Sequence, residues 1–499
     1  MQIKQMPGSD DYLMVLATSE EVDKRYLMGW SPIKHSMWWK VEDNLVNRIV
    51  LGMPILSAAQ RQEIKVSPMP HLFKYQYDDV IKLCGRVNAL NANPMGLGKT
   101  LETIMVLREN GLMDRVLILC PKSVTYQWKE ELENWWPETK GKIDVLPTHV
   151  GSSGITIMNY ERAITKKMRP QLNRFRWEVV ICDEAHRIKS RTSVRTKLVH
   201  SLPAGRRFAL TGTPVLNKPN DLWSLLNWLD WRYSGKSYHS FTNYFCDVED
   251  GFFGPSIKGL TKNSAKEAIL VKLLNEVGVY NENTMGMGKR VITVNLPMDA
   301  KQKKLYKDAK NLVFENLPDT MTIPNGAVLL MRLQQITSNP HLFEPTAINP
   351  KFLWILDTIE DNPEEKFVVF TRFSQTLQAL QKRIGPGRCV VYEGQMSAAE
   401  RSAAIKQFKT DPAIRCLIGT IGALGQGVDG LQHVSRTAIF IERDWSPALM
   451  QQAEDRLNRI GQKHQVLVYC LDCPNTVDKY VGRVNLRKRE DIEKVLRGE

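Results

Sequence analysis

The sequence lacks a long hydrophobic run. No apolar stretch approaches the ~18 residues that a membrane-spanning helix needs. The first residues, MQIKQMPGSDDYLM, also lack the basic-then-apolar order of a signal peptide. We therefore expect no membrane association, and a location in the cytoplasm, at the nucleoid or, for a viral protein, in the host cytoplasm; a nuclear location stays open.

Cysteines are few and scattered. Of the eight, only Cys470 and Cys473 form a C-x-x-C pair, and neither a second pair nor a histidine pair lies nearby. A structural zinc site needs about four such ligands, so we predict none. Cys120 and Cys182 lie inside strand-like apolar runs, which suits reduced thiols in a core. The sequence therefore predicts a reducing, intracellular compartment.

Acidic residues are fewer than basic ones. The 499 residues include 68 Lys and Arg against 54 Asp and Glu, a formal net charge of +14. This excess favours a polyanionic partner, either nucleic acid or an anionic membrane surface; the alternative is an ordinary soluble protein with a basic surface. With 43% hydrophobic and 24% charged residues, the chain is not largely disordered.

Short apolar runs alternate with amphipathic helical stretches in two blocks. Apolar runs of this kind are typical of parallel strands that are buried on both faces. In order, the runs are RVLILC (115–120), GITIM (154–158), EVVIC (178–182), RRFAL (206–210), KFVVF (366–370), RCVVY (388–392), RCLIG (415–419), TAIFI (437–441) and QVLVYCL (465–471). Two blocks of β-α-β alternation predict an α/β protein with two parallel-sheet lobes in tandem.

Two segments interrupt this rhythm. Residues 216–290 carry three tryptophans followed by aromatics and glycines, which predicts a mostly helical insertion. Residues 1–66 form a separate module, in which GWSPIKHSMWW predicts a short hairpin. We therefore divide the chain into a small N-terminal module (1–66), a first lobe with its insertion (67–290), a second lobe (291–487) and a charged C-terminal helix (488–499).

The segment NPMGLGKT (93–100) directly precedes a helical stretch that begins LETIMVL. A phosphate-binding loop needs small residues whose backbone N–H groups face the phosphates at a helix N-terminus. It also needs a lysine for the β- and γ-phosphates and a hydroxyl for Mg²⁺. Two glycines, Lys99 and Thr100 supply these parts, although Asn93 stands where the general pattern has its first glycine. We expect ATP to bind here; the alternative is an ordinary loop–helix junction.

DEAH (183–186) follows the apolar run EVVIC. Its carboxylates therefore leave the C-terminal end of a strand, where α/β sheets bind ligands. We expect Asp183 to hold Mg²⁺ and Glu184 to polarise the attacking water. The alternative is a solvated acidic loop, which fits less well because the Lys99 loop is expected on the same sheet.

Two further segments accompany these motifs. LTGTP (210–214) follows the run RRFAL, and its Thr211 and Thr213 hydroxyls are placed to report the nucleotide state, although Gly-Thr-Pro also occurs in plain turns. Upstream of Lys99, the amide of Gln76 can both donate to and accept from adenine. A single glutamine is usually a surface residue, so this assignment depends on the other motifs.

The second block contains two arginines three residues apart. QQAEDRLNRIGQ (451–462) predicts a helix that places Arg456 and Arg459 on one face. Arginines that stabilise charge on a transferring phosphoryl group are worth roughly 10³–10⁵-fold in rate in other nucleotidases. Such a pair is more often a solvated helix face, but this block has no phosphate loop of its own. A nucleotide site shared by the two lobes accounts for both features, and the glycine-rich turn TIGALGQGVDG adds Gly427 and Asp429 to it.

In this order the motifs resemble those of superfamily-two helicases and, more narrowly, the Swi/Snf (Snf-two) family of ATP-dependent DNA translocases. Family-specific support comes from MRLQQITSNPHLF (331–343), VVYEGQMSAAERSAAIKQF (390–408) and DWSP (444–447). The resemblance covers residues 67–485, and QAEDR is most similar to the branch that contains the annealing-helicase-type enzymes. It implies two RecA-like lobes, ATP hydrolysis with Mg²⁺, and movement along DNA.

The resemblance implies a role for each matching position. ATP contacts fall on Gln76, Asn93, Pro94, Met95, Gly96, Leu97, Gly98, Lys99, Thr100, Gly427 and Asp429. The implied Mg²⁺ ligands are Thr100 and Asp183. The other implied catalytic residues are Lys99, Glu184, Arg456 and Arg459. Coupling of nucleotide to DNA falls on His186, Thr211, Gly212, Thr213 and Gln452. Contacts to the DNA backbone fall on Lys122, Ser123, Thr125, Asn159, Tyr160, Arg372, Gly394 and Thr420.

The sequence departs from the family pattern at three places. Asn93-Pro94 replaces the usual acidic pair before MGLGKT, and Asp429 stands where the close family often has Asn. The Arg-Arg segment usual before the second lobe is absent, since the chain reads NENTMGMGKR there. The core chemistry is untouched, but the last departure puts the family's interlobe regulation in doubt.

The N-terminal module is less distinctive. GWSPIKHSMWWKVEDNLVNRIV loosely resembles the HARP-type module of annealing helicases. The alternative is a small packing cap on the first lobe. Trp30, Trp38 and Trp39 suit either role, as core residues or as a platform on which unpaired bases stack.

We therefore expect a monomeric, DNA-dependent ATPase that moves along duplex or fork DNA and can anneal or remodel forks. Phosphate contacts position a protein on DNA without specifying sequence, which fits a basic chain with no base-reading motif. One alternative is a strand-separating helicase on DNA or RNA, which needs a wedge that we do not recognise here. Another is an ATP-binding scaffold without turnover, against which Lys99, Glu184 and the two arginines argue. No protein partner is indicated.

Overall fold

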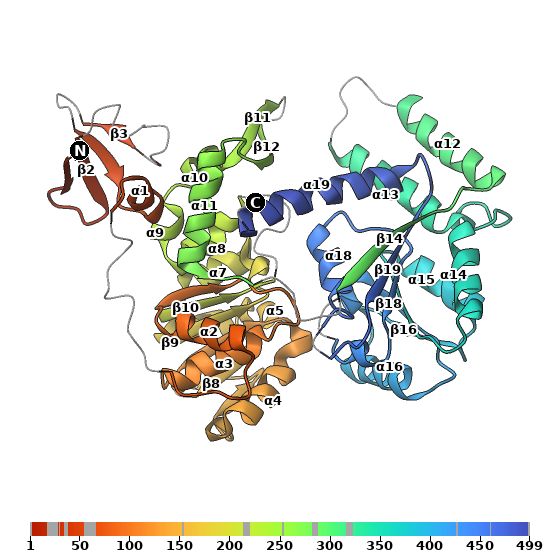
Figure 1. The fold of residues 1–499 in the computed structure, drawn as a ribbon, viewed down its shortest axis with the longest axis horizontal. Helices are drawn as coiled ribbons and strands as arrows, with labels where there is room; N and C mark the ends of the chain where they lie inside the picture. Colours follow the sequence, from red (N-terminus) through yellow and green to blue (C-terminus); the bar gives the residue numbers. More distant parts are fainter. Residues whose placement is uncertain are drawn as a thin grey trace. The chain divides into compact units, whose positions relative to one another are not determined.

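The computed structural model describes residues 2–16, 28, 30–33, 38–53, 66–151, 154–212, 220–251, 254–281, 288–315, 323–425, 428–459 and 461–497. The chain divides into two compact units (Figure 1). Unit 1 comprises Met1–Glu282 and Lys488–Glu499, and unit 2 comprises Asn283–Arg487. Each unit is built on one parallel sheet with helices on both faces, so the expected α/β fold with two parallel-sheet lobes is confirmed.

Unit 1 has a seven-stranded parallel sheet in the order β13-β5-β10-β9-β6-β8-β7. The four strands expected in the first block form its centre. The other three are too short to show a pattern in the sequence. The strands are β5 (Asn88–Asn91), β6 (Val116–Cys120), β7 (Ile143–Val145), β8 (Ile155–Asn159), β9 (Trp177–Asp183), β10 (Ala204–Leu210) and β13 (Gly278–Val279).

Two hydrophobic cores sandwich this sheet, because successive residues of a strand point to opposite faces. Leu117 and Leu119 of β6 enter one core, and Val116 and Ile118 enter the other. The second core also holds residues of α2 (Lys74–Cys84), α3 (Lys99–Glu109) and α4 (Thr125–Trp135). The first holds residues of α5 (Tyr160–Ala163), α6 (Met168–Arg174), α7 (Val194–Ser201) and the helices of the insertion.

The insertion is helical but also contains strands that were not expected. A two-stranded antiparallel hairpin separates its third and fourth helices. After the last helix the chain returns to the main sheet as β13, where an added Cβ on Gly278 would lie 2.2 Å from the Leu90 carbonyl oxygen, so only glycine fits. The elements are α8 (Asp221–Leu229), α9 (Trp231–Ser234), α10 (Tyr238–Phe245), β11 (Cys246–Gly251), β12 (Gly254–Leu260) and α11 (Ser264–Val277).

The N-terminal module is a four-stranded antiparallel sheet in the order β1-β2-β4-β3, followed by α1 (Leu45–Val50). Its small core contains Leu13, Val15, Val41 and Leu51. Because β3 pairs with β4 antiparallel, the expected hairpin is confirmed at its paired ends; residues 34–37 of its turn lie outside the described ranges. The strands are β1 (Gln2–Gln5), β2 (Tyr12–Leu16), β3 (Ser31–Pro32) and β4 (Trp39–Glu42).

The module packs on the insertion. Leu45 and Val46 of α1 belong to the same core as α8, α10 and α11. The buried Glu42 carboxylate accepts a hydrogen bond from the Lys236 amide at 3.2 Å, and the Lys236 ammonium lies 2.5 Å from the Asp11 carboxylate. Trp30 is 40% exposed and its ring centroid lies 6.0 Å from that of Trp39. These contacts fit a packing cap; the resemblance to a HARP-type module stays a prediction.

Unit 2 has a six-stranded parallel sheet in the order β14-β19-β18-β15-β17-β16. The five strands expected in the second block are confirmed. β14 was not expected, since it is half-exposed and its sequence, KRVITVN, is not an uninterrupted apolar run. The strands are β14 (Lys289–Asn295), β15 (Phe367–Thr371), β16 (Cys389–Tyr392), β17 (Cys416–Thr420), β18 (Thr437–Phe440) and β19 (Val466–Asp472).

Helices cover both faces of this sheet as well. One core takes Phe408, Met450 and the glycine-rich turn, and the other takes Phe352, Ile355 and Leu377. The helices of unit 2 are α12 (Ala300–Glu315), α13 (Ile323–Ser338), α14 (Pro350–Asp361), α15 (Ser374–Ile384), α16 (Ala398–Thr410), α17 (Ile421–Leu424), α18 (Pro447–Glu454) and the part of α19 (Val477–Arg497) that precedes Lys488.

The cysteines are all buried, and none forms a disulfide. In the described ranges no group of three or more His, Cys, Asp or Glu side chains could hold a metal ion. No helix among the described residues is both long and apolar enough to cross a membrane.

A buried ion pair joins the start of α14 to the start of α19. Lys351 is fully buried, and its ammonium donates to the Asp478 carboxylate and to the Ile441 carbonyl, both at 2.8 Å. Asp478 also accepts from the Thr337 hydroxyl at 2.8 Å and the Cys473 amide at 3.0 Å. Burial lowers the pKa of Lys351, but the charge and hydrogen bond of Asp478, together with the nearby Cys473 and Glu442, outweigh it, so the pKa is raised above its usual value. Lys351 therefore remains charged at neutral pH.

We expect Lys351→Met and Asp478→Asn each to destabilise unit 2 by ~3–5 kcal/mol, because each leaves a buried charge without its partner. The double variant should lose much less than the sum, since it buries no unpaired charge. Amide exchange of β15 and β18 reports the free energy of opening. The exposed Lys382→Met on α15 is the control. Additive losses in the double variant would show that the two side chains do not act as a pair.

Candidate nucleotide site

Three of the expected motifs follow three adjacent strands of unit 1. The phosphate loop follows β5, Thr211 follows β10, and DEAH begins at the end of β9. The register places Leu210 beside both Asn91 and Asp183. Since these strands are parallel, the motifs leave the sheet at the same edge and at the same level, which is where sheets of this class bind ligands.

The phosphate loop turns on two glycines. Gly96 and Gly98 have φ angles of 84° and 90°, which side chains rarely tolerate. An added Cβ on Gly98 would lie 2.3 Å from the Gln76 side-chain nitrogen, so the position also needs glycine for space. Gly98 is the N-cap of α3, and Lys99 and Thr100 are its first two residues. The loop therefore delivers a helix N-terminus, whose first backbone N–H groups have no partner within the helix, as phosphate binding requires.

The Lys99 ammonium lies within this loop. It donates to the Asn93 carbonyl at 2.7 Å and to the Pro94 carbonyl at 3.1 Å. Its charge also lowers the pKa of Asp183, although other influences on that carboxyl are larger. The Lys99 charge therefore lies in the phosphate loop and acts on Asp183 at the end of β9.

Gln76 and Tyr75 hold the loop from the side of α2. The Gln76 amide donates to the Leu97 carbonyl at 3.0 Å and accepts from the Phe73 backbone at 3.1 Å. The Tyr75 hydroxyl donates to the same Leu97 carbonyl at 2.7 Å. Gln76 is only 3% exposed. Its adenine contact stays a prediction, and the structure gives it a supporting role that the sequence did not suggest.

Asp183 is fixed by donors on both oxygens. One oxygen accepts from the Trp128 indole at 2.9 Å and the other from the Glu184 amide at 2.8 Å. Burial and the adjacent Glu184 carboxylate raise the pKa of Asp183 to about 6. A carboxylate at a strand end supplies the oxygen ligands that Mg²⁺ prefers.

Glu184 adopts a left-handed backbone conformation, with φ of 49°. A non-glycine residue in this region costs on the order of 1 kcal/mol, so the surrounding contacts must hold it there. The turn starts the short 3-10 helix Ala185–Ile188 and brings the His186 Nδ1 to 3.2 Å from the Glu184 carboxylate. The DEAH residues are therefore held by local contacts rather than extended into solvent.

The LTGTP segment lies against the phosphate loop. The Thr211 amide donates to the Asn91 carbonyl at 3.0 Å. An added Cβ on Gly212 would lie 3.1 Å from the Met95 amide nitrogen, so the two segments pack closely. This placement suits a residue that reports loop movement. Thr213 lies outside the described residues.

Beneath the loop lies a buried network of amides and carboxylates. The Asn93 side chain donates to Asp79 at 2.7 Å and to Glu102 at 3.1 Å, and Asn91 donates to Glu102 at 2.6 Å. Asn281 donates to Asp79 at 2.6 Å. Burial raises the pKa of Asp79, and it raises that of Glu102 to about 8. Of this network, only Asn93 was singled out from the sequence. Asp79 and Glu102, the acidic residues on the buried faces of α2 and α3, were a signal that could have revealed the rest.

In unit 2 the expected helix over 451–462 is wrong in its second half. α18 ends at Glu454, and the following residues form turns. The Arg456 guanidinium is 4% exposed and donates to the carbonyls of Gly425 at 2.8 Å and Val428 at 3.0 Å. Arg456 therefore closes the glycine-rich turn, and this irregular packing ends the helix.

Arg459 lies near the same turn. Its guanidinium pairs with the Asp429 carboxylate and donates to the Asp455 carbonyl at 2.9 Å. Gln452, expected to couple nucleotide to DNA, is 1% exposed in α18. Gly427 lies outside the described residues. Arg456, Arg459 and Asp429 are thus brought together within unit 2.

The candidate DNA contacts differ widely in exposure. Lys122, Ser123 and Gly394 are exposed, and Thr420 is half-buried. Arg372 pairs with Asp444 at 2.9 Å. Asn159 is 7% exposed, and Thr125 and Tyr160 are fully buried, with the Tyr160 hydroxyl donating to the Asp183 carbonyl at 2.8 Å. The last two side chains serve the core, so we leave them out of the DNA surface proposed below.

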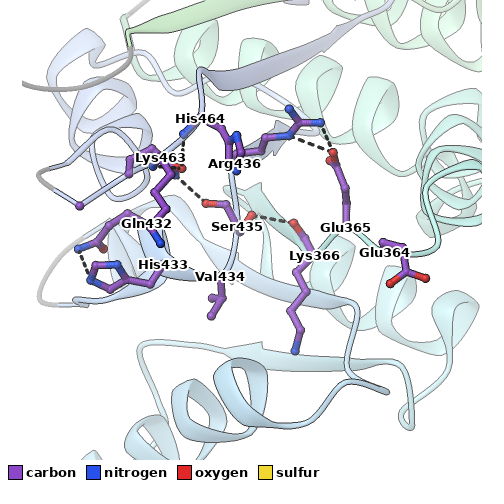
Figure 2. Close-up of a pocket in the computed structure, with 12 residues that line it drawn as sticks. Glu364, Glu365, Lys366, Gln432, His433, Val434, Ser435, Arg436, Lys463 and His464 are labelled. Carbon is purple, nitrogen blue, oxygen red and sulfur yellow. Dashed lines mark hydrogen bonds and ion pairs between the residues drawn. The ribbon is translucent and has the colours of Figure 1, made fainter.

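A separate hollow of about 520 Å³ lies in unit 2 (Figure 2). Its walls include residues just before β15, β18 and β19, so it lies at the amino ends of the strands. Arg436 pairs with Glu365 there, and the Lys366 ammonium donates to the carbonyls of Phe408 and Asp411. The hollow is therefore at the edge of the sheet opposite the glycine-rich turn, and its Arg436 and Glu365 are paired with each other.

Comparisons with known proteins agree with the expected family. A family described as SNF2-related domain matches residues 80–342, and one described as helicase conserved C-terminal domain matches residues 350–461. The mouse "DNA annealing helicase and endonuclease ZRANB3" is 29% identical over 450 residues, which is 86% of this chain and 41% of that protein. The human "SWI/SNF-related matrix-associated actin-dependent regulator of chromatin subfamily A member 1" is 27% identical over 83% of this chain and 42% of that protein.

A bacterial relative and a solved structure are also similar. An "Uncharacterized ATP-dependent helicase" of Mycoplasma pneumoniae is 25% identical over 85% of this chain and 42% of that protein. The chain spans about two fifths of the length of these three relatives. The "Sulfolobus solfataricus SWI2/SNF2 ATPase core in complex with dsDNA" is 24% identical, with a TM-score of 0.40, and the match covers 87% of this chain and 95% of that one. The SNF2-related match alone takes in more than half of the sequence, and this chain belongs to the SNF2-related family.

Proposed function

We propose that this chain is a DNA-stimulated ATPase that uses ATP hydrolysis to move along duplex or fork DNA. The observation that carries the proposal is the edge of the unit 1 sheet, where the phosphate loop, Thr211 and Asp183 follow three adjacent strands in register. The names of the relatives support it, since they include a DNA annealing helicase and an ATP-dependent helicase. Fork remodelling or annealing is the finer form of the same proposal.

Unit 1 supplies the nucleotide-binding groups. The backbone donors at the start of α3 bind phosphate, the Lys99 ammonium moves from the loop carbonyls to the β- and γ-phosphates, and Gln76 contacts adenine. Thr100 and Asp183 hold Mg²⁺, which when bound offsets charge on the phosphates. The raised pKa of Asp183 means that this carboxyl binds metal better above about pH 6 than below it.

Glu184 orients and polarises the attacking water. Its left-handed backbone and the contact with His186 fix the carboxylate at the end of β9. In this proposal, five residues couple the nucleotide state to DNA: His186, Thr211, Gly212, Thr213 and Gln452. For Gly212, the close packing on Met95 supports that role, because any loop movement must displace it.

Unit 2 supplies the arginine that stabilises charge in the transition state. Of the two candidates, Arg459 is the stronger, because Arg456 is buried and committed to two carbonyls of its own turn. The Asp429 carboxylate holds the Arg459 side chain until the nucleotide competes for it. Arg456 then acts by shaping the turn that carries Asp429.

DNA binds through phosphate contacts without sequence preference. The net charge of +14 and the exposed Lys122, Ser123 and Gly394 support this part of the proposal. Arg372, Asn159 and Thr420 are further candidates, of which Arg372 must first exchange Asp444 for a phosphate. We propose a monomer as the working form.

Two alternative functions use the same motifs. A strand-separating helicase on DNA or RNA hydrolyses ATP equally well but also unwinds. A scaffold binds ATP without turnover. The first differs in its product and the second in its rate, so two assays separate all three.

ATP hydrolysis should rise with duplex or fork DNA more than with single-stranded DNA or RNA. Glu184→Gln should keep ATP binding and lose turnover, because only the activation of water is removed, whereas Lys99→Ala should weaken nucleotide binding as well. Steady-state phosphate release and equilibrium nucleotide titration measure the two effects. The exposed Glu130→Gln on α4 is the control. Absence of turnover in the unaltered protein would support the scaffold instead.

Arg459→Ala should lower kcat far more than ATP affinity, by up to roughly 10³-fold, because its contact forms mainly in the transition state. Arg383→Ala, an exposed arginine on α15, serves as the matched control. Single-turnover hydrolysis with each variant gives the rate of the chemical step. A normal rate with Arg459→Ala would remove unit 2 from the proposed catalytic site.

The motor should displace a triplex-forming third strand and leave a simple tailed duplex intact, because a motor that tracks the backbone of an intact duplex needs no strand separation. Fluorescent third-strand release and tailed-duplex unwinding, run side by side with ATP, make the comparison. Glu184→Gln controls for ATP-independent release. Efficient unwinding of the tailed duplex would favour the helicase alternative.

A further inference from the structure

A glutamine on α13 is buried with both polar atoms of its side chain bonded. Gln334 is fully buried, and its side-chain oxygen accepts from the Arg372 guanidinium at 2.5 Å and from the Trp445 indole at 3.2 Å. Its side-chain nitrogen donates to the Arg443 carbonyl at 2.7 Å. An amide without partners would be costly to bury. Gln334 therefore joins α13 both to the residue that follows β15 and to the segment that follows β18.

Arg372, one of the candidate DNA contacts, is held at its backbone and at its side chain. Its backbone amide donates to the buried Glu442 carboxylate, which fixes the main chain at the end of β15. Its guanidinium has two acceptors, since Nε donates to Asp444 at 2.9 Å while Nη1 donates to Gln334. The side chain is still 24% exposed. The guanidinium is thus held in place without being enclosed, and an anion can reach it.

The two acceptors of this guanidinium differ in charge. Asp444 is a carboxylate whose other oxygen accepts from the Ser446 amide at 2.8 Å, whereas Gln334 is neutral. An approaching phosphate is repelled by Asp444 and competes with it for the same cation, but it is not repelled by Gln334. The pair of Arg372 with Asp444 is partly exposed, and such pairs are weak in water. Gln334 can therefore keep its hydrogen bond while a phosphate takes the place of Asp444.

We propose that Gln334 is a positioning residue that holds the Arg372 guanidinium while Asp444 gives way to a DNA phosphate. An unrestrained arginine loses side-chain freedom when it binds phosphate, and an arginine held by Gln334 has lost much of that freedom beforehand. Asp444 is the competitor in this exchange and weakens the binding of DNA. The inference rests on the proposed function, in which Arg372 contacts the DNA backbone.

The test is the affinity of the protein for a fluorescent duplex, measured by anisotropy at several salt concentrations. Arg372→Ala should weaken binding and lower the slope of log affinity against log salt by about 0.9, because one phosphate contact is lost. Gln334→Met removes both polar atoms at nearly constant volume, and it should weaken binding by roughly 3- to 10-fold, the cost of immobilising one long side chain. Combined with Arg372→Ala, it should weaken binding no further.

Asp444→Asn should act in the opposite direction. It removes the competing charge, and its side-chain oxygen can still accept from the Ser446 amide, so binding should strengthen by roughly 2- to 5-fold. This gain should disappear when Arg372 is replaced by alanine. Asp357→Asn, which neutralises an exposed carboxylate on α14, is the matched control and should leave the affinity nearly unchanged.

Two further variants separate the positioning of Arg372 from a purely structural role. Trp445→Phe removes the other donor to the Gln334 oxygen and should leave the affinity unchanged. Gln335→Met alters the neighbouring, half-buried glutamine of α13 and should do the same. Amide exchange of β15 and β18 shows whether each variant is folded. If Gln334→Met is not, Gln334→Asn replaces it, because that side chain keeps its amide but is one methylene shorter.

The outcomes separate the inference from the underlying function. If Arg372→Ala changes neither affinity nor salt slope, the DNA contact of Arg372 fails, and the inference fails with it. If Arg372→Ala acts as expected, the positioning role alone is overturned by a Gln334 variant that binds normally or that costs the same factor without Arg372. An equal loss in Trp445→Phe would overturn it too. Absence of a gain in Asp444→Asn would overturn the exchange.

Discussion

The shape of the phosphate loop depends on hydrogen bonds between buried amides and carboxylates. A loop that presents backbone N–H groups to phosphate can be stabilised only from its other side. Here Asn93 holds Asp79 and Glu102 together beneath the loop, and Gln76 braces it from α2. An unpaired carboxylate in this place would be costly, so the asparagines make the burial possible. An aspartate at position 93 would instead add a third acid to the same site.

The same network explains why the exit of the chain lies where it does. Asn281 completes the hydrogen bonding of Asp79, and β13 brings it there by joining the sheet next to β5. Gly278 allows that approach because no side chain fits against the Leu90 carbonyl. A two-residue strand thus fixes the point from which unit 2 is attached, directly beside the nucleotide motifs.

Much of this architecture could be predicted from the sequence. Nine strands could be predicted because each is an uninterrupted apolar run in the sequence. The nucleotide motifs follow strand ends, which is where α/β sheets bind ligands. β13 could not be predicted, because two residues are too few to show a periodic pattern. Its pairing partner, β5, also lies far away in the sequence. β14 was missed because its half-exposed residues, KRVITVN, do not form an uninterrupted apolar run like those of the buried strands.

The sequence predicted most residues of the candidate site. It predicted less well what each of them contacts. The spacing of Arg456 and Arg459 predicted that both lie on one helix. It could not reveal that Arg456 donates to the carbonyls of Gly425 and Val428, beyond the end of α18. Tyr160 follows a strand end, yet it is buried beneath Asp183. The network around Asp79 was hidden because its members come from four separate segments that only the folded sheet brings together.

The central claim is that unit 1 binds ATP in the loop above this network and that duplex DNA accelerates the chemical step. The most direct measurement is single-turnover hydrolysis, with enzyme in excess over labelled ATP, with and without closed circular duplex DNA. The account predicts a clear rise in the rate with DNA and no hydrolysis in Lys99→Ala under either condition. A rate that is the same with and without DNA, or that survives the loss of Lys99, would contradict it.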